Sequence, residues 1–393
     1  MTEVILKDIC ELIVDCPHST AVDEGKGYPL VRTPNIGKGR LIYSGMHRVN
    51  EEVYNKRNAR AIPQEDDLIF AREATAGNVA LIQKGEKVCL GQRTVLIRPN
   101  KSLVNPAFLT YMLLAPKQQY NLLSTANGAT VAHVNMPTIR NLKLELPPMA
   151  TQRQIAEVLS RYDALIENYQ RQIKLLEEAA QRLYKEWFVD LRFPGHESTP
   201  IINGIPEGWE KKKLIEIADV QYGYAFDGSL FNCDKKGMPI VRIRNIPDGY
   251  TGDYTTEEAS QEYIVRDSDI LVGMDGIFHI NTWSGGEAYL VQRACSFRPK
   301  DQLLKGFILQ AIYEPIKYFE KTLVGSTVAH LGKKHIDSIL LLVPNNKSLF
   351  EPFTRFFNQR QGLLAQIRHL SEARDRLLPK LMNGEIDIID YNS

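Results

Sequence analysis

The sequence predicts an α+β protein in which two similar modules alternate with two long helices. The first observation is an internal repeat: residues 27–36 (GYPLVRTPNI) match residues 237–246 (GMPIVRIRNI) without a gap, 210 positions later. The second is that short β-type runs bounded by Gly, Pro and Asn follow each of these segments. The third is a heptad stripe of apolar residues at the end of each half. Together they indicate a duplicated chain with pseudo-twofold symmetry.

The repeat continues in order along both halves, with an offset that shrinks from 210 to 194 because loops gain and lose residues independently. The matching segments are Asp67-Leu68-Ile69 with Asp269-Ile270-Leu271, Gln92-Arg93 with Gln292-Arg293, and Gly128 to His133 with Gly325 to His330.

Composition limits the class of protein. The chain has 393 residues, 44% hydrophobic and 24% charged, which suits two or three globular domains. Its five cysteines are scattered and form no Cys-x-x-Cys pair, which argues against a disulfide framework and a structural zinc site. No leader and no apolar run near the ~20 residues of a membrane span is evident, so we expect a cytoplasmic protein with no membrane partner. The net charge of +1 argues against phosphate binding by bulk charge, so a nucleic-acid partner would need local positive charge or charge supplied by another subunit.

The first module is predicted to span residues 1–147, and the second, residues 206–344, repeats its order of elements. The first has one clear helical stretch, residues 106–123, and the second has its counterpart at residues 305–321. The β-type runs of the first module are residues 29–33, 67–72, 79–82, 94–98 and 142–146.

The first long helix is expected within residues 148–192, followed by a linker at residues 193–205. Thr151 and Gln154 form a capping box behind Pro147-Pro148. The stripe defines a rod of roughly 50 Å at 1.5 Å per residue. Its residues are Ile155, Leu159, Tyr162, Ile166, Tyr169, Ile173, Leu176, Ala180, Leu183 and Trp187.

The second long helix and the C-terminal tail occupy residues 345–393, with a capping box at Ser348 and Glu351. Arg360 and Arg374 interrupt its stripe. Each exposed Leu or Ile would forgo roughly 1.5 to 3 kcal/mol of burial, so we expect the two helices to pair with each other, antiparallel. The alternative is that each helix packs only on its own module. The stripe residues are Phe353, Phe356, Leu363, Ile367, Leu370, Leu377 and Leu381.

These features together resemble the specificity subunit of type I DNA restriction-modification systems over almost the whole chain. The resemblance rests on the paired G-x-P-x-V-R-x-x-N-I segments and the Gly-x-Thr turns before an apolar strand and Pro. It also rests on Trp187-Phe188, Pro206-x-Gly208-Trp209, Leu377-Leu378-Pro379-Lys380-Leu381 and Gly384-Glu385-Ile386.

The resemblance implies that each module is a target-recognition domain and that the two long antiparallel coiled-coil helices separate these domains and dock other subunits. The implied partners are double-stranded DNA, two modification (methyltransferase) subunits and restriction subunits. It implies no cofactor in this chain: S-adenosylmethionine, ATP and Mg would be bound by the partners.

Motifs for catalysis are not found. The sequence has no Asn/Asp-Pro-Pro-aromatic tetrad of an amino-methyltransferase and no G-x-x-x-x-G-K-[ST] loop. Cys16-Pro17-His18 could suggest a metal or nucleophile site, but we favour an ordinary loop. The function predicted is therefore non-catalytic DNA recognition. The alternatives are a self-contained DNA-modifying enzyme with an unrecognised active site and a coiled-coil adaptor.

Residues kept in both halves are expected to be framework or phosphate contacts, because the two modules should read different bases. An Arg of this set could instead pair with Asp67 or Asp269. The set comprises Arg32, Arg242, Asn35, Asn245, Thr130 and Thr327.

Base-reading residues are expected where the halves diverge, because Arg, Asn and Gln can form paired hydrogen bonds with base edges. Residues 38–60 are rich in basic and aromatic residues, as in a nucleic-acid loop, although a solvated loop is the alternative. The candidates of the first module are Lys38, Arg40, Arg48, Lys56, Arg57, Arg60 and Arg72, and those of the second are Arg244, His279, Lys333 and Lys334.

Overall fold

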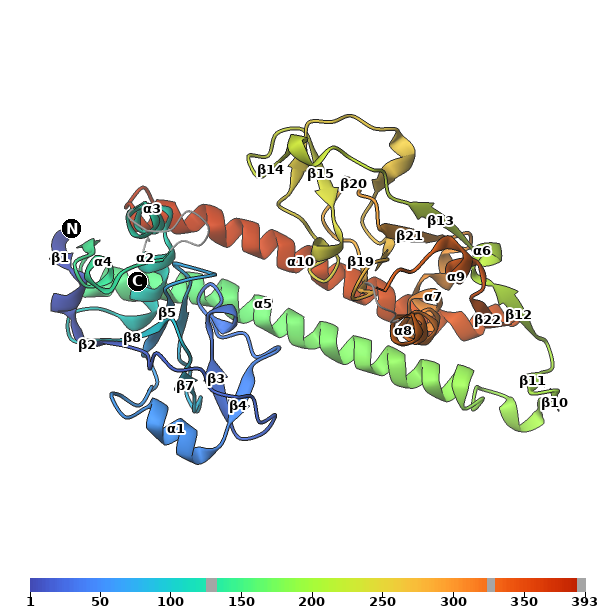
Figure 1. Cartoon of the computed structure of the whole chain (residues 1–393), viewed down its shortest axis with the longest axis horizontal. Helices are drawn as coiled ribbons and strands as arrows, with labels where there is room; N and C mark the ends of the chain where they lie inside the picture. Colours follow the sequence, from blue (N-terminus) through green and yellow to red (C-terminus); the bar gives the residue numbers. More distant parts are fainter. Residues whose placement is uncertain (125–132, 324–328, 387–393) are drawn as a thin grey trace, which may run out of the picture. The chain divides into compact units, whose positions relative to one another are not determined.

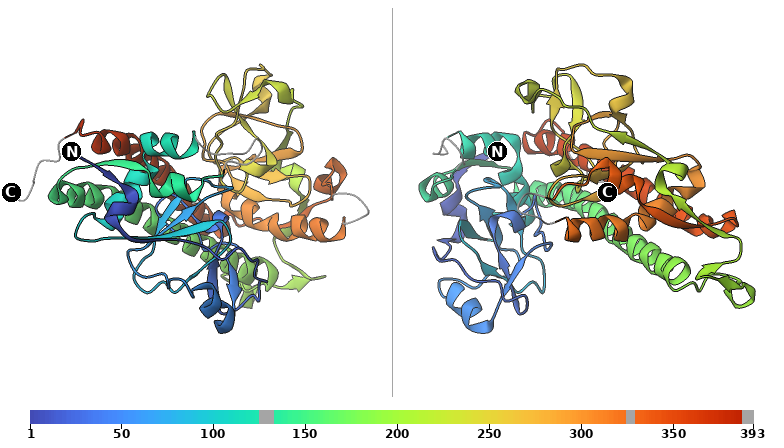
Figure 2. Two further views of the ribbon diagram at one scale, coloured as in Figure 1. Left: turned by 60° about the vertical axis from the view of Figure 1, so that its left-hand side comes forward. Right: turned by 45° about the vertical axis from the view of Figure 1, so that its right-hand side comes forward.

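The computed structural model describes residues 1–124, 133–323 and 329–386. The chain divides into two compact units, residues 1–166 with 370–393 and residues 167–369. Each unit contains one β-rich module and part of both long helices (Figures 1 and 2). The mixture of helix and sheet in each unit confirms the predicted α+β class.

The module of the first unit is built on a four-stranded antiparallel sheet in the order β2-β8-β5-β6. Strands β5 and β8 lie at its centre because their runs, LIFA and TVLIRP, are apolar enough to be buried on both faces. A second sheet, β4-β3-β7, pairs β3 with β7 in parallel. The strands are β1 (Thr2–Ile5), β2 (Cys10–Asp15), β3 (Tyr28–Val31), β4 (His47–Val49), β5 (Leu68–Ala71), β6 (Val79–Leu81), β7 (Cys89–Leu90), β8 (Thr94–Pro99) and β9 (Lys143–Leu146).

The predicted helix over residues 106–123 is wrong in one respect, since it is two helices. Helix α2 (Pro106–Leu114) ends at Ala115, whose ψ of 144° is extended, and α3 (Pro116–Leu123) follows. A residue before proline avoids the helical region because the proline ring clashes with it, so Pro116 breaks the helix. The remaining short helices of this module are α1 (Glu51–Arg57) and α4 (Met136–Arg140).

The module of the second unit repeats this topology. Its central sheet, β13-β21-β18-β19, corresponds strand for strand to β2-β8-β5-β6, and β15 pairs with β20 in parallel as β3 does with β7. The duplication predicted from the sequence is therefore confirmed by the strand pairing. The strands are β10 (Ile201–Ile202), β11 (Ile205–Pro206), β12 (Trp209–Lys213), β13 (Ala218–Tyr222), β14 (Phe231–Asn232), β15 (Met238–Val241), β16 (Tyr254–Thr255), β17 (Ile264–Val265), β18 (Ile270–Gly273), β19 (Ile280–Thr282), β20 (Ala288–Leu290), β21 (Ala294–Pro299) and β22 (Leu340–Pro344).

The helices of this module also follow the repeat. The stretch predicted as one helix at residues 305–321 is again two, α7 (Lys305–Ala311) and α8 (Tyr313–Thr322), joined at Ile312. The short helices are α6 (Leu214–Ile217) and α9 (Lys333–Asp337).

Both long helices are present, but neither begins at its predicted capping box. Helix α5 (Met149–Tyr184) starts two residues before Thr151 and ends in a π-helical turn, Lys185–Val189. Helix α10 (Glu351–Met382) follows a 3₁₀ turn that is capped by the side chain of Asn346, which accepts from the Ser348 amide. An Asn at the N-cap serves as well as the predicted Ser, because its side chain likewise accepts a hydrogen bond from a free backbone amide of the first turn.

The long helices contact each other inside each unit. In the first unit, Ile155 and Leu159 of α5 share a core with Leu377 and Leu381 of α10, beside α2. In the second, the Tyr184 and Phe353 rings lie 6.4 Å apart. The idea that each helix packs only on its own module is therefore wrong. The other predicted stripe residues are buried or half-buried: Tyr162, Ile166, Tyr169, Ile173, Leu176, Leu183, Trp187, Phe356, Leu363, Ile367 and Leu370.

Candidate nucleic-acid interface

A polar cluster lies at the ends of β5 and β8 in the first module, and we name it the first cluster. Glu73 follows β5, Arg93 precedes β8, and His133 lies just before Val134. The Glu73 carboxylate forms an ion pair with Arg93, and its Oε1 is 2.6 Å from His133 Nδ1. Because Arg93 remains 62% exposed, the carboxylate orients the guanidinium without burying it.

The second module contains the same arrangement, the second cluster, at the ends of β18 and β21. Asp275 replaces Glu73, Arg293 replaces Arg93, and His330 replaces His133. Both the Arg293 Nη1 and the His330 Nδ1 lie 2.5 Å from carboxylate oxygens of Asp275. Burial opposes ionisation of this carboxyl group, but the two hydrogen bonds prevail and lower its pKa.

The two arginines also share an unusual backbone conformation. Arg93 has a φ of 64° and Arg293 a φ of 68°, in the left-handed region that side chains other than glycine rarely adopt. In each, the carbonyl oxygen accepts a hydrogen bond from the strand across the cluster, from the Arg72 amide at 2.9 Å and from the Met274 amide at 2.8 Å. Such strain costs about 1 to 3 kcal/mol per residue, and its retention in both copies suggests a function for these positions.

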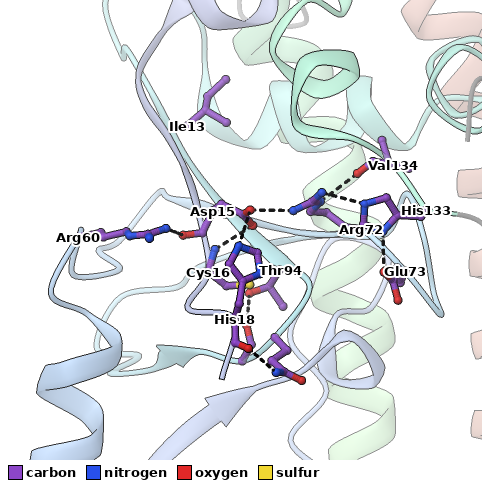
Figure 3. Close-up of polar contacts among 12 residues, drawn as sticks. Ile13, Asp15, Cys16, His18, Arg60, Arg72, Glu73, Thr94, His133 and Val134 are labelled. Carbon is purple, nitrogen blue, oxygen red and sulfur yellow. Dashed lines mark hydrogen bonds and ion pairs between the residues drawn. The ribbon is translucent and has the colours of Figure 1, made fainter. Parts of the chain in front are cut away.

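The first cluster extends inward through Arg72 (Figure 3). Its guanidinium donates to the Val134 carbonyl at 3.0 Å and to Asp15 at 2.8 Å, and its Nη2 is 2.8 Å from His133 Nε2. Only 10% of the side chain is exposed. Arg72, predicted as a DNA contact, is instead the buried centre of this network.

The second cluster has no such extension. Met274 occupies the position of Arg72, as the matching backbone hydrogen bonds to Leu331 and Val134 show. Tyr222 occupies the position of Asp15, since each lies at the end of the strand paired with β21 or β8. The buried Tyr222 hydroxyl has no hydrogen-bond partner among the described residues, and burial raises its pKa.

The repeated Arg and Asn residues form a turn after β3 and after β15. The Asn35 Oδ1 accepts from the Arg32 amide at 3.2 Å, and the Asn245 Oδ1 accepts from the Arg242 amide at 2.9 Å. Asn35 is only 2% exposed, so it is a framework residue and not a DNA contact. Asn245 has the same role in its turn.

The arginines of these turns do not pair with Asp67 or Asp269. Arg32 donates to the Gly45 carbonyl at 3.0 Å, and Arg242 lies 5.4 Å over the Phe231 ring. The partners of the two aspartates are Arg98 and Arg298, at 2.8 Å and 2.7 Å. The alternative pairing that the sequence left open is therefore wrong.

Residues 38–60 are not the loop that their composition predicted. They include β4 and α1, and the side chain of Asn50 caps α1 by accepting from the Val53 amide at 2.9 Å. Arg57, 5% exposed, donates to the Leu90 carbonyl at 2.8 Å, so it too belongs to the framework. The exposed candidates of this segment are Lys38, Arg48, Lys56 and Arg60, and Arg40 is half-buried.

The second-module candidates differ in how available they are. Lys333 and Lys334 are exposed in α9, whereas the exposed Arg244 is held by three hydrogen bonds to Asp253, at 3.2, 2.7 and 2.6 Å. His279 is half-buried, and burial together with Lys317 lowers its pKa. Thr130 and Thr327 lie outside the described residues.

Sequence reasoning missed the carboxylates that organise both clusters, Glu73 and Asp275. A signal existed, because Arg93 and His133 recur as Arg293 and His330 in the repeat. The sequence alone does not join these residues into a site, because the three are far apart in the chain. Cys16 is no nucleophile candidate: the residue is buried, and burial raises the pKa of its thiol.

The described residues contain neither a candidate metal site nor a candidate membrane span. No three or more His, Cys, Asp or Glu residues in these ranges gather where they could hold a metal ion. None of the helices found there is both long and apolar enough to cross a membrane.

Comparisons with known proteins agree on one family. The sequence matches the profile described as type I restriction modification DNA specificity domain over residues 1–178 and 206–368. It is 26% identical over 411 residues to the type I restriction enzyme MjaIX specificity subunit of Methanocaldococcus jannaschii, an alignment that covers 98% of this chain and 93% of the relative. The EcoBI specificity subunit of Escherichia coli is 32% identical over 147 residues, 36% of this chain and 31% of its own.

A solved structure has the same fold. The crystal structure of the S subunit of a type I restriction-modification system from M. genitalium superposes with a TM-score of 0.54 and 16% sequence identity. The alignment covers 99% of this chain and 96% of that one.

Proposed function

Because this chain belongs to the type I restriction modification DNA specificity family, we propose that it is the non-catalytic subunit that selects the DNA target of a type I restriction-modification complex. The target would consist of two short half-sites separated by bases that are not read. The observation that carries this proposal is the duplication: one chain holds two modules with the same sheet and the same cluster but with different exposed residues around them.

Arg93 and Arg293 are proposed as phosphate contacts. Contacts to the DNA backbone carry no sequence information, so modules that read different bases can share them. Each arginine side chain is mostly exposed, at 62% and 65%, and is held by a carboxylate that limits its rotamers. A strained backbone kept in both modules supports this role. Arg32 and Arg242 belong to the same shared class.

Bases would be read by exposed side chains that differ between the modules. In the first module these are Lys38, Arg48, Lys56 and Arg60, with Arg40 beside them, and in the second they are Arg244, Lys333 and Lys334. His279 has a pKa lowered by burial, and in its neutral form it accepts as well as donates a hydrogen bond.

Helices α5 and α10 are proposed to pair antiparallel, to set the distance between the half-sites and to dock two modification subunits and the restriction subunits. The contacts between them within each unit support this pairing. The partners would bring S-adenosylmethionine, ATP and Mg. They would also supply further phosphate contacts, which accounts for a recognition chain with a net charge of only +1.

The test is a genome-wide map of methylated adenines in a host with and without the gene. We expect one bipartite motif to lose methylation in the deletion strain. Replacing residues 206–344 with the second module of a relative should then change one half of the motif only. A change in both halves would contradict modular reading, and methylation by the purified chain alone would favour the self-contained enzyme.

The phosphate contacts have a separate test. The complex with modification subunits should bind its target more weakly when Arg93→Gln and Arg293→Gln are combined, and the slope of log affinity against log salt should fall by about 1 per arginine. Lys117→Gln and Arg266→Gln, which remove cations of similar exposure from ion pairs elsewhere, are the controls. An unchanged salt slope would exclude both arginines, while binding to no duplex at all would favour the adaptor.

A further inference from the structure

Two ion pairs are built into the apolar stripe that joins the long helices. In the first unit, Arg374 of α10 donates to the Asp163 carboxylate of α5 at 2.6 Å. The other oxygen of Asp163 accepts from the Tyr111 hydroxyl of α2 at 2.5 Å. The Asp163 side chain is 6% exposed and that of Arg374 is 17% exposed, so this pair is shielded from water.

The second unit holds the other pair. Arg360 of α10 donates to Glu177 of α5 at 2.6 Å, and it also donates to Asn281 at 2.7 Å and to Thr282. The Arg360 side chain is only 11% exposed. These are the arginines that interrupt the stripe, so each interruption is matched by an acid on the facing helix.

The two pairs have the same spacing and the same polarity. Fourteen residues separate Asp163 from Glu177, and fourteen separate Arg360 from Arg374, which is two heptads on each helix. Both acids belong to α5 and both arginines to α10. The charges within the stripe are therefore complementary between the helices and alike within each helix.

We propose that these two ion pairs select α10 of the same chain as the partner of α5 and exclude pairing between two copies of either helix. Apolar contacts cannot make this choice, because duplication gave both helices the same stripe: Ile173 and Leu176 match Ile367 and Leu370 at an offset of 194. Two copies of α5 would bury their apolar residues about as well as α5 does with α10. The charges remove that ambiguity.

The offset of 194 residues between matching positions of α5 and α10 predicts which residues would face each other if two copies of the same helix paired. Arg374 less 194 is position 180, so in two paired copies of α5 the Asp163 carboxylate would face Ala180. Glu177 would face Ile166 by the same arithmetic, because 360 less 194 is 166. If the register between the two α5 helices shifted so that their charged positions met, Asp163 of one copy would lie opposite Glu177 of the other, and both side chains are acidic.

Two copies of α10 meet the same difficulty. Position 163 plus 194 is 357, so Arg374 would face Phe357, and Arg360 would face Ser371. A buried charge without a partner destabilises a pairing far more than a satisfied pair stabilises it. Specificity therefore comes from the penalty on the wrong pairing, as with a polar residue in a coiled-coil core. This inference is independent of DNA recognition.

The experiment uses two full-length variants with opposite charge changes. The first carries Asp163→Arg and Glu177→Arg, and the second carries Arg360→Glu and Arg374→Asp. In each variant alone, like charges face each other within the chain. When the two are mixed, each α5 finds its complement on the α10 of the other variant, so we expect an exchanged complex of one copy of each, with twice the mass of the single chain by light scattering.

The combination of all four changes in one chain restores both pairs with inverted charge, and this chain should return to the wild-type mass. The control is the exposed pair on α5, exchanged as Glu157→Arg with Arg161→Glu, which should change neither mass nor melting temperature. If either double variant is insoluble alone, differently tagged copies of the two are co-expressed. Co-purification of both tags then replaces light scattering as the measurement of association. The proposal is overturned if each double variant keeps the melting temperature and mass of the wild type. It is also overturned if the two double variants fail to associate when they are mixed or co-expressed.

Discussion

The first and second clusters have the same outer part and different inner parts. In both, a carboxylate holds one left-handed arginine and one histidine. Behind them the first module has the ion pair of Arg72 with Asp15, whereas the second has Met274 and Tyr222. His133 is accordingly 30% exposed and His330 61% exposed.

After the duplication, the carboxylate that orients the exposed arginine was therefore kept in both modules. The buried residues beneath it were free to change. A buried network holds its members in one arrangement only if all of them are satisfied. The first cluster meets that condition through Arg72, and the second does without a buried charge. We therefore expect the first module to depend on its cluster for stability far more than the second module does.

The largest effect is expected from Arg72→Met, which gives the first module the residue of the second. It leaves Asp15 without its cation and removes three contacts, so the free energy of unfolding should fall by about 3 to 5 kcal/mol in urea titrations. Adding Asp15→Tyr, which removes the stranded carboxylate, should recover part of that loss. A double variant less stable than Arg72→Met would show that the inner pairs are not interchangeable.

A smaller effect is expected from the ion pair that both modules share. Arg98→Ala should cost roughly 2 to 4 kcal/mol, because it strands Asp67, whose side chain is 2% exposed. Arg298→Ala should cost less, since Arg298 is 34% exposed and water screens its pair with Asp269. Thermal unfolding of the two variants measures the difference, and a larger loss for Arg298→Ala would reverse the comparison.

The smallest effect concerns Asp275, whose pKa is lowered in the folded chain. The folded state therefore favours the carboxylate, so its contribution to stability is present above the ordinary pKa of 3.8 and is lost as pH falls through the lower folded value. Asp275→Asn should lower the free energy of unfolding by roughly 1 to 2 kcal/mol at pH 7. The variant should also lose less stability than the wild type between pH 5 and pH 3. Equal losses would mean that Asp275 is not linked to folding.

The sequence by itself determined the duplication, the α+β class and the two long helices with their stripes. Each of these features is encoded by a local sequence pattern: a repeat of GxPxVR, runs of β-forming residues, or apolar residues at heptad spacing. A local pattern depends only on residues close together in the sequence, so it can be recognised before the tertiary structure is known. The same locality explains the errors, because the breaks at Ala115 and Ile312 and the cap at Asn346 depend on single residues within otherwise helical or polar stretches.

Only the tertiary structure decided which charged residues are available and which are buried. Arg57 and Arg72 look like DNA contacts in the sequence, yet their guanidiniums are held by carbonyl oxygens and by Asp15 from distant strands. Arg360 and Arg374 look like flaws in a stripe, yet each meets an acid on the facing helix. The sequence states which residues are charged. The free energy of each charged group depends on its exposure to water and on partners from distant parts of the chain, and both are set only when the chain folds.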